Sequence, residues 1–366
     1  MTSSPLTYRS AGVSYETLDT LKRLAQLEGK KSAVHTELKE VSQSRGESAY
    51  VWEEKDCYRA LVIEGLGTKN LIADAMRKIT ARTYYDAIAQ DTVAMIVNDL
   101  IVVGAKPQVV NAYFGVGNSD WFSDKKRAGD LVTGWAKACK LAGAVWGGGE
   151  TPTLKDIIKP DTIDLAGSAI GIIKPKRRLI LGDKLTAGDA ILLIESNGIH
   201  ANGLTLARAI AQKFPRGYAT KLPSGSRYGE ALLRPTHIYT QIVEDLFLNG
   251  IEVHYMVHIT GHGWRKLMRA NRSFRYIIDD IGKVPPIFGF IQTHSGMNDR
   301  DMYATFNMGA GFALFVPSDE REKAQRIIAR NKLACWRAGT VKNGPKQVLI
   351  RPKAITFSAG SLRVRP

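Results

Sequence analysis

Apolar residues along this chain follow two patterns, one with helical spacing and one of short continuous runs. Leu18, Leu21, Leu24 and Leu27 recur every three residues in a polar background, which predicts a helix near the start of the chain. Similar spacing, three or four residues apart, predicts further helices at 91–103, 120–144, from Leu204, and at 235–249, 262–271 and 319–333.

Short apolar runs that end in glycine-containing turns predict the strands. They fall between the predicted helices, so that strand, glycine turn and helix follow one another in both halves of the chain. This alternation is typical of α/β or α+β domains with mixed sheets flanked by helices. The strands are expected at 58–63, 108–114, 163–173, 190–194, 276–279 and 312–316.

The chain is long enough for two domains, since 366 residues can build two separate cores. A basic cluster at 174–178 and a turn at 186–189 mark the boundary between them. We therefore expect an N-terminal domain at 1–175, a C-terminal α/β domain at 176–345, and a basic C-terminal tail at 346–366.

The balance of charges narrows the class of ligand. Lys and Arg number 51 against 35 Asp and Glu, a net charge of +16, which favours anionic partners such as nucleotides or phosphorylated metabolites. Nucleic acid is a less favoured partner, because no basic tract is interleaved with aromatic residues. Three widely spaced cysteines support neither a zinc site nor a disulfide framework. No apolar run is long enough to span a membrane, so we expect a cytoplasmic protein.

Polar residues stand beside glycines at several turns next to the predicted strands and helices. The stretch 305–311 combines a hydroxyl, an amide and two glycines immediately before a predicted strand. Such turns bring backbone N–H groups close to an anionic ligand, although strand geometry alone also explains them. The candidate ATP- or phosphate-binding residues are Gly65, Gly67, Thr68, Asn98, Gly148, Gly149, Asn202, Thr260, Gly261 and Asn307.

Carboxylates in the first half form a candidate metal site. Glu64, Asp91, Asp99 and Glu150 all lie at or near predicted turns. Several carboxylates with a lysine suit a hydrated Mg²⁺ that bridges phosphate oxygens, because magnesium keeps most of its waters. The alternative is that these carboxylates cap helices or lie on the surface.

Three side chains are candidate catalytic groups. Lys69 follows a glycine turn and is expected to meet phosphate, unless it is a solvated lysine. His200 and His258 are candidates for substrate contact or proton transfer, and their alternative is a structural role in the core.

Seven segments, in order along the chain, resemble motifs of the aminoimidazole ribonucleotide synthetases, the phosphoribosylformylglycinamidine cyclo-ligases of purine synthesis. The similarity extends over roughly residues 8–345. The segments are Glu64-Gly-Leu-Gly-Thr-Lys69, Met95–Leu100 with Gly104-Ala105 and Pro107, Gly148-Gly-Glu-Thr151, Gly198–Gly203, Pro235–Tyr239, His258–Gly263, and Met302–Gly311.

The resemblance implies a two-domain, homodimeric, ATP-dependent enzyme that uses Mg²⁺. ATP and magnesium would bind the N-terminal domain, which would also form the dimer, and formylglycinamidine ribonucleotide would lie between the halves. The γ-phosphate would activate the formyl amide oxygen, and an amidine nitrogen would then close the imidazole ring.

The chain departs from the family pattern at four places. Glu64 replaces an aspartate, Pro152 opens a segment that lacks an acidic residue, His262 falls in a glycine region, and residues 44–48 replace a glycine-rich loop. These departures leave two alternatives open. One is a sister enzyme of the superfamily that acts on another amide or carboxyl group, and the other is a non-catalytic paralogue that binds nucleotide or nucleic acid.

Overall fold

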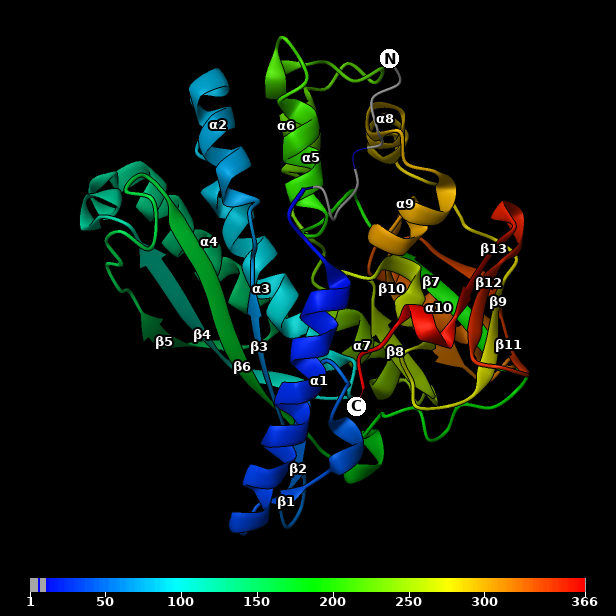
Figure 1. Ribbon diagram of the computed structural model, residues 1–366. Coiled ribbons are helices and arrows are strands. Elements are labelled where there is room, and N and C mark those ends of the chain that lie inside the picture. Colours follow the sequence, from blue (N-terminus) through cyan, green and yellow to red (C-terminus); the bar gives the residue numbers. More distant parts are fainter. Residues whose placement is uncertain (1–5, 7–10, 366) are drawn as a thin grey trace.

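Two lobes, each built on one sheet, make up the molecule (Figure 1). We describe a computed structural model that covers Leu6 and residues 11–365. The first sheet has the strand order β1-β2-β3-β6-β4-β5, antiparallel except for the β4–β5 pair. Its strands are β1 (Lys39–Glu40), β2 (Tyr50–Glu53), β3 (Tyr58–Gly65), β4 (Lys106–Val116), β5 (Val145–Glu150) and β6 (Ile163–Ile173).

Helices α3 (Tyr85–Ile101) and α4 (Lys125–Ala142) cover one face of this sheet, and α2 (Asn70–Thr80) packs against α3. Small residues on β6 allow α3 to lie close to the strands. A Cβ on Gly167 would come within 2.4 Å of the Asn111 carbonyl oxygen and 2.7 Å of Ile96, and a Cβ on Gly171 would come within 2.9 Å of Leu100. The small residues of the predicted strand 163–173 therefore serve the packing of helix on sheet.

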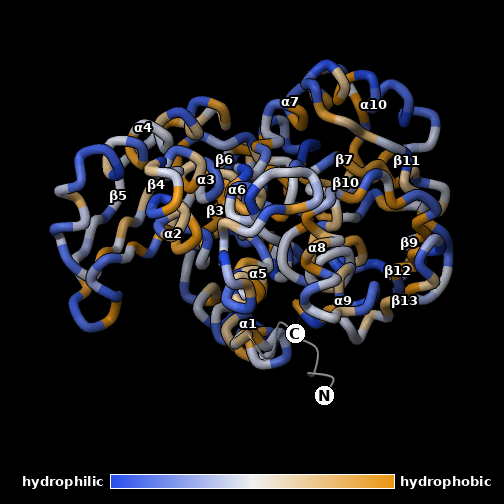
Figure 2. Tube along the Cα trace, turned by 90° about the horizontal axis from the view of Figure 1, so that it is seen from above, coloured by the Kyte–Doolittle hydropathy of each residue, from blue (hydrophilic) through white to orange (hydrophobic). Residues whose placement is uncertain are grey.

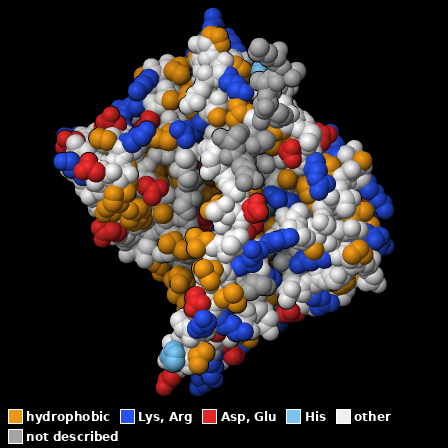
Figure 3. Space-filling view, viewed as in Figure 1, with side chains coloured by type: hydrophobic (Ala, Val, Ile, Leu, Met, Phe, Trp, Pro, Cys, Tyr) orange, Lys and Arg blue, Asp and Glu red, His pale blue; other side chains and the backbone are white. Residues whose placement is uncertain are grey.

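The other face of the first sheet carries an apolar row that no helix of the described residues covers. Leu61, Ile170, Val109 and Val145 are register partners across β3, β6, β4 and β5, so their side chains share this face. Leu61 and Val145 are 45% and 65% exposed, and Ile63, two residues along β3, is 75% exposed. Figure 3 shows orange side chains gathered over this lobe.

The second lobe contains a seven-stranded sheet of order β13-β12-β9-β11-β7-β10-β8. Strand β10, which lies between β7 and β8, is buried along its whole length. The strands are β7 (Ala190–Glu195), β8 (Tyr255–His258), β9 (Phe274–Ile278), β10 (Ala310–Val316), β11 (Cys335–Asn343), β12 (Gln347–Ile350) and β13 (Ile355–Ser358). The helices are α5 (Leu204–Ala211), α6 (Tyr228–Leu232), α7 (Thr240–Leu248), α8 (Pro286–Ser295), α9 (Asp299–Thr305) and α10 (Arg321–Arg330).

Two segments differ from the prediction. Residues 346–366, expected as a tail, contribute β12 and β13 to the second sheet, where Val348, Ile350 and Phe357 are buried. The helix expected at 262–271 is a 3-10 segment, Gly263–Met268, because the backbone at 262 and 263 has positive φ and cannot continue a regular helix.

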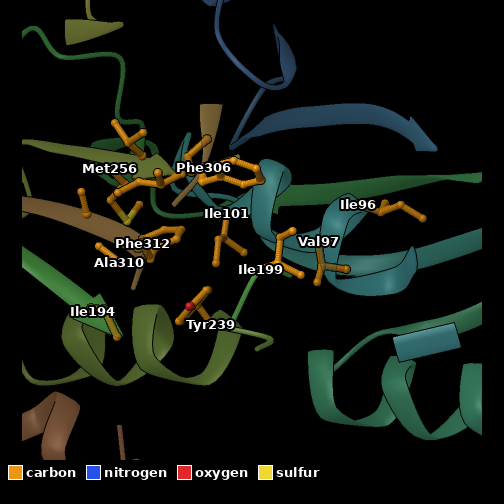
Figure 4. Packing of buried hydrophobic residues seen from close by; sticks show 14 of the residues in the cluster. Ile96, Val97, Ile101, Ile194, Ile199, Tyr239, Met256, Phe306, Ala310 and Phe312 are labelled. Carbon is orange, nitrogen blue, oxygen red and sulfur yellow. The ribbon is translucent and has the colours of Figure 1, made fainter. Parts of the chain in front are cut away.

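Helix α3 lies between the two sheets and is buried on almost every side. Its residues Ile96, Val97 and Ile101 belong to the same apolar cluster as Ile199 and Phe306 of the second lobe (Figure 4). The two lobes therefore share one continuous core across α3.

Helix α1 (Tyr15–Ser32) lies against the junction of the lobes (Figures 1 and 2). It confirms the predicted N-terminal helix, but its leucines are partly exposed, and its one fully buried side chain is Asp19. Within the described chain, no helix is long and apolar enough to cross a membrane.

Candidate functional site

A cavity of about 400 Å³ opens where the two lobes, α1 and the C-terminal segment (residues 362–365) meet. Its wall is mostly polar or charged and draws on residues far apart in the sequence. The lining residues are Val13, Tyr15, Leu18, Lys22, Gln26, Glu47, Ser48, Glu64, Met95, Asp99, Asn202, Thr260, Gly261, His262, Lys266, Arg269, Leu362 and Val364. Of the candidates from the sequence, the cavity brings together Glu64, Asp99, Asn202, Thr260 and Gly261.

Two carboxylates face each other in the cavity. Burial, together with the charge of Asp99, raises the pKa of Glu64 to about 7. Burial alone would also raise the pKa of Asp99, but Lys266 and His258 outweigh it, so this pKa falls below its ordinary value. The pair therefore concentrates negative charge, with Asp99 ionised and Glu64 titrating near neutrality.

Lys266 provides the positive charge opposite this pair. It comes from the 3-10 segment, and its Nζ donates to Thr260 Oγ1 and to the carbonyl oxygen of His258, the latter at 3.3 Å. Burial lowers the pKa of Lys266 to about 8, although the charge of Asp99 opposes this shift. An ammonium group with so few solvent contacts can stabilise charge that develops on a bound substrate.

The two candidate histidines are both buried. His258, at the end of β8, places Nδ1 2.6 Å from Asp99 Oδ1, and its Nε2 has no hydrogen-bond partner among the described residues. His200 has no partner at either ring nitrogen within the same part of the chain. Burial lowers the pKa of both rings, so both are neutral at pH 7. Neither lines the cavity, and His258 adjoins it through Asp99.

His262 holds α1 over the cavity. Its Nε2 lies 3.0 Å from Asp19 Oδ2, and its backbone N–H donates to Tyr15 Oη at 3.0 Å. The rings of Tyr15 and His262 also stack, with centroids 4.0 Å apart. The imidazole that replaces a glycine of the family pattern thus faces α1, which it fastens to the second lobe.

Lys69 and Asp91 form a buried ion pair outside the cavity lining. Their charged atoms lie 2.8 Å apart, and neither side chain is exposed. Lys69 also donates to the carbonyl oxygens of His200 and Arg234, and Asp91 accepts from the N–H and hydroxyl of Thr236. The pair thus joins the lobes, and in this conformation the Lys69 ammonium has its donors directed at protein oxygens and not at a phosphate.

Two candidate amides also make structural contacts. Asn98 donates to the His237 carbonyl oxygen and accepts from the Tyr239 N–H, which ties α3 to the second lobe. Asn307 accepts from Ser196 Oγ and donates to the Gly198 carbonyl oxygen, which shapes the turn before β10.

The remaining candidates lie at the ends of strands in the first sheet. Gly148, Gly149 and Glu150 are exposed on β5, the edge strand, and do not line the cavity. Gly65, Gly67 and Thr68 connect β3 to α2, where the hydroxyl of Thr68 is buried without a partner in the described region.

The fold of a single chain therefore does not bring the four predicted metal ligands together. Glu64 and Asp99 share the cavity, whereas Asp91 is occupied by Lys69 and Glu150 is on the sheet edge. Within residues 11–365 and Leu6, no group of three or more His, Cys, Asp or Glu side chains is arranged to hold a metal ion.

Sequence reasoning missed several charged residues of the cavity, among them Lys266, Arg269, Lys22 and Glu47. Lys266 follows the turn 258–263 by only three residues, so extending that motif by one helical turn would have found it. Glu47 lies in residues 44–48, which the resemblance marked as replacing a glycine-rich loop, but it was not named as a site residue. Lys22 carries no local signal, because only the packing of α1 brings it to the site.

Solved structures with the same fold support the architecture. A HypE–HypF complex aligns with a TM-score of 0.60 at 17% identity, covering 86% of this chain and 93% of that one. AaThiL complexed with AMPPCP and TMP aligns with a TM-score of 0.59 at 14% identity, covering 91% and 94%. The fold and the site define a two-lobed α/β protein with the fold that these structures share.

Sequence comparison then gives the family. Residues 46–173 match the family model "AIR synthase related protein, N-terminal domain", and residues 186–351 match the corresponding C-terminal domain. A phosphoribosylformylglycinamidine cyclo-ligase of Thermococcus kodakarensis is 37% identical over 89% of this chain and 92% of its own length. That of Pyrococcus horikoshii is 34% identical over 96% and 100%. The chain belongs to the phosphoribosylformylglycinamidine cyclo-ligase family.

We expect Lys69→Met to destabilise the protein by about 3–5 kcal/mol, because it leaves Asp91 buried without its counter-charge. The double variant Lys69→Met/Asp91→Asn should recover much of this loss, since no unpaired charge remains. Urea unfolding gives the free energies, and Lys78→Met, an exposed change on the same helix, is the control. Equal stability of the single and double variants would contradict the buried-pair interpretation.

We expect Glu64→Gln to stabilise the fold above pH 7 by roughly 3 kcal/mol, because the pKa of Glu64 rises from 4.5 to about 7 and one pKa unit corresponds to about 1.4 kcal/mol. The raised pKa means that ionising Glu64 disfavours the folded state. This penalty grows as the pH rises from the unfolded value, 4.5, through about 7. The stabilisation should therefore vanish below pH 4.5. Thermal unfolding between pH 4 and pH 9 measures it, with the exposed Glu150→Gln as a control that should show no such trend.

Proposed function

We propose that this cavity is the active site of an ATP-dependent cyclo-ligase. The reaction converts formylglycinamidine ribonucleotide and ATP into aminoimidazole ribonucleotide, ADP and phosphate. One observation carries the proposal: in a chain of the cyclo-ligase family, a single cavity brings carboxylates of the first lobe, Glu64 and Asp99, against Thr260 and Lys266 of the second.

The chemistry requires activation, because an amide oxygen is a poor leaving group. Transfer of the γ-phosphate to the formyl oxygen makes it a good one. The amidine nitrogen then attacks the formyl carbon, the C–O bond breaks, and the oxygen leaves with the phosphate. A cavity closed by both lobes, α1 and the C-terminal segment can hold the substrate in the folded geometry that ring closure needs.

We assign roles to this chain's residues from their contacts. Lys266 would stabilise negative charge on the transferring phosphoryl group. His258 would accept a proton at Nε2, because Asp99 takes the hydrogen bond of Nδ1 and thereby selects the tautomer with a free Nε2 lone pair.

Glu64 and Asp99 suit a magnesium ion. The carboxylates lie close enough for the charge of Asp99 to raise the pKa of Glu64, and a cation between them would relieve this repulsion. When bound, Mg²⁺ would neutralise charge on phosphate oxygens, and two carboxylates suffice because it keeps several waters. Asn202 and Gly261 would contact the substrate or its phosphates from the second lobe.

The remaining assignments stay proposals. We place the domain boundary near 175, with the C-terminal domain extending to the end of the second sheet, and the enzyme in the cytoplasm. The glycines of β5 and of the β3–α2 turn, with Glu150, are proposed for ATP binding across a dimer interface.

The bare face of the first sheet supports a homodimer. Four register-matched apolar side chains cross it, and they would be removed from water against a second copy. Because Glu150 and Gly148 lie on the edge strand of the same sheet, such a dimer would bring these ATP candidates to the interface.

We expect Asp99→Asn to reduce turnover by roughly a hundredfold or more, since it removes a charge that positions both Lys266 and His258. The assay follows ADP release that depends on formylglycinamidine ribonucleotide. Asp86→Asn, at the exposed start of the same helix, is the matched control and should keep full activity. ADP release by the unaltered enzyme that does not depend on the ribonucleotide would refute the proposed reaction.

We expect Ile63→Arg to convert the dimer into a monomer, because a guanidinium group would have to be buried in the apolar interface. Light scattering after size-exclusion chromatography measures the mass. Leu248→Arg, an equally exposed change on the second lobe, should leave the dimer intact. A monomeric unaltered protein would contradict the assembly.

A further inference from the structure

A second cavity, also of about 400 Å³, adjoins the first and shares Arg269, Leu362 and Val364 with it. Cations dominate its wall, and among the described residues no Asp or Glu lines it. They come from α1 (Arg23), from the residue after the 3-10 segment (Arg269), from the turn before β12 (Lys346) and from the C-terminal segment. The full lining is Arg23, Arg269, Asn271, Lys346, Leu362, Arg363, Val364 and Arg365.

The charges of this cavity are poorly compensated. Glu47 is the carboxylate that pairs with Arg365 and, at 3.9 Å, with Arg269. Among the described residues, the other three cations donate only to neutral acceptors. Lys346 donates to the carbonyl oxygen of Ala270, and Arg363 donates to the carbonyl oxygen of Gly360. Arg23 donates to Oγ1 of Thr20. Three of the five cations, Arg269, Arg365 and Lys346, thus act on one buried carboxylate, Glu47.

Two features indicate a ligand site within this cluster. Burial, together with the charge of Arg365, lowers the pKa of Lys346. The cations of the cluster therefore repel one another. The Nε of Arg365 is buried and has no hydrogen-bond partner among the described residues. An anion in the cavity would relieve the repulsion, and the guanidinium groups have the planar geometry that binds phosphate oxygens in pairs.

We propose that the second cavity is a phosphate subsite of the active site. It takes a phosphate group of a substrate whose reacting part lies in the first cavity, and in this respect it rests on the proposed function. The phosphate has two sources, the ribose 5-phosphate of the ribonucleotide or the polyphosphate of ATP. In the C-terminal segment, Leu362 and Val364 line both cavities, and Arg363 and Arg365 line the second. The segment then serves as a binding element as well as a closing strap.

The test is calorimetric titration of the full-length protein with ATP and, separately, with ribose 5-phosphate at fixed ionic strength. In the variant Lys346→Met/Arg363→Gln, we expect the Kd of the ligand that uses the subsite to rise at least tenfold, because two charged donors are lost. The Kd of the other ligand should not change, which identifies the source.

The matched control is Arg330→Gln/Lys342→Met, which removes the same charge from exposed positions of the second lobe that line neither cavity. Thermal unfolding checks that both variants fold. Unchanged affinity for both ligands in the test variant, equal losses in test and control, or no binding of either ligand to the unaltered protein would each overturn the subsite. Binding is measured without turnover, so the two proposals can fail separately. If the unaltered protein has no cyclo-ligase activity but the test variant still loses affinity for one ligand, the reaction is refuted and the subsite is not.

Discussion

A row of polar side chains on one buried helix holds this molecule together. On α3, Asp91 lies two turns before the adjacent residues Asn98 and Asp99. All three are buried and face the second lobe. Buried polar groups without partners are strongly unfavourable, so the second lobe must present complementary groups at each position. It does so with Thr236, with the backbone at 237 and 239, and with His258. The relative placement of the lobes therefore follows from these contacts and from the apolar core around them.

Asp91 and Asp99, at the two ends of this row, differ in the charges that surround them. Asp91 is neutralised by Lys69, so this end of the row is closed and serves stability. Asp99, two turns further along, has Glu64, His258 and Lys266 around it and opens into the cavity. The difference arises from the counter-charges, because a carboxylate paired with a fully buried lysine has no free oxygen for a ligand, whereas a carboxylate beside a second carboxylate attracts a cation.

Closure of the site depends on the two ends of the chain. Helix α1 is fastened by His262 and Asp19, and Gln26 donates to the Val364 carbonyl oxygen at 3.0 Å, which links α1 to the C-terminal segment. Arg365 reaches back to Glu47 in the loop before β2. His262 falls where the resemblance implies glycine, so this contact lies at one of the places where the chain departs from that pattern.

The sequence by itself determined the kinds of elements and their order, because helical and strand periodicities are local properties of neighbouring residues. The strands around the glycine turns and the α/β class were predictable in this way, while the family was predicted from the resemblance of seven ordered motifs. It also determined which turns carry polar groups. Only the tertiary structure decided what each polar group does. His258 meets Asp99 across 159 residues, and Lys69 meets the backbone at 200 across 131, and no local pattern encodes such distant partners. In this structure Lys69 is held by Asp91 and by two backbone carbonyl oxygens, while packing places Lys266 beside the carboxylates.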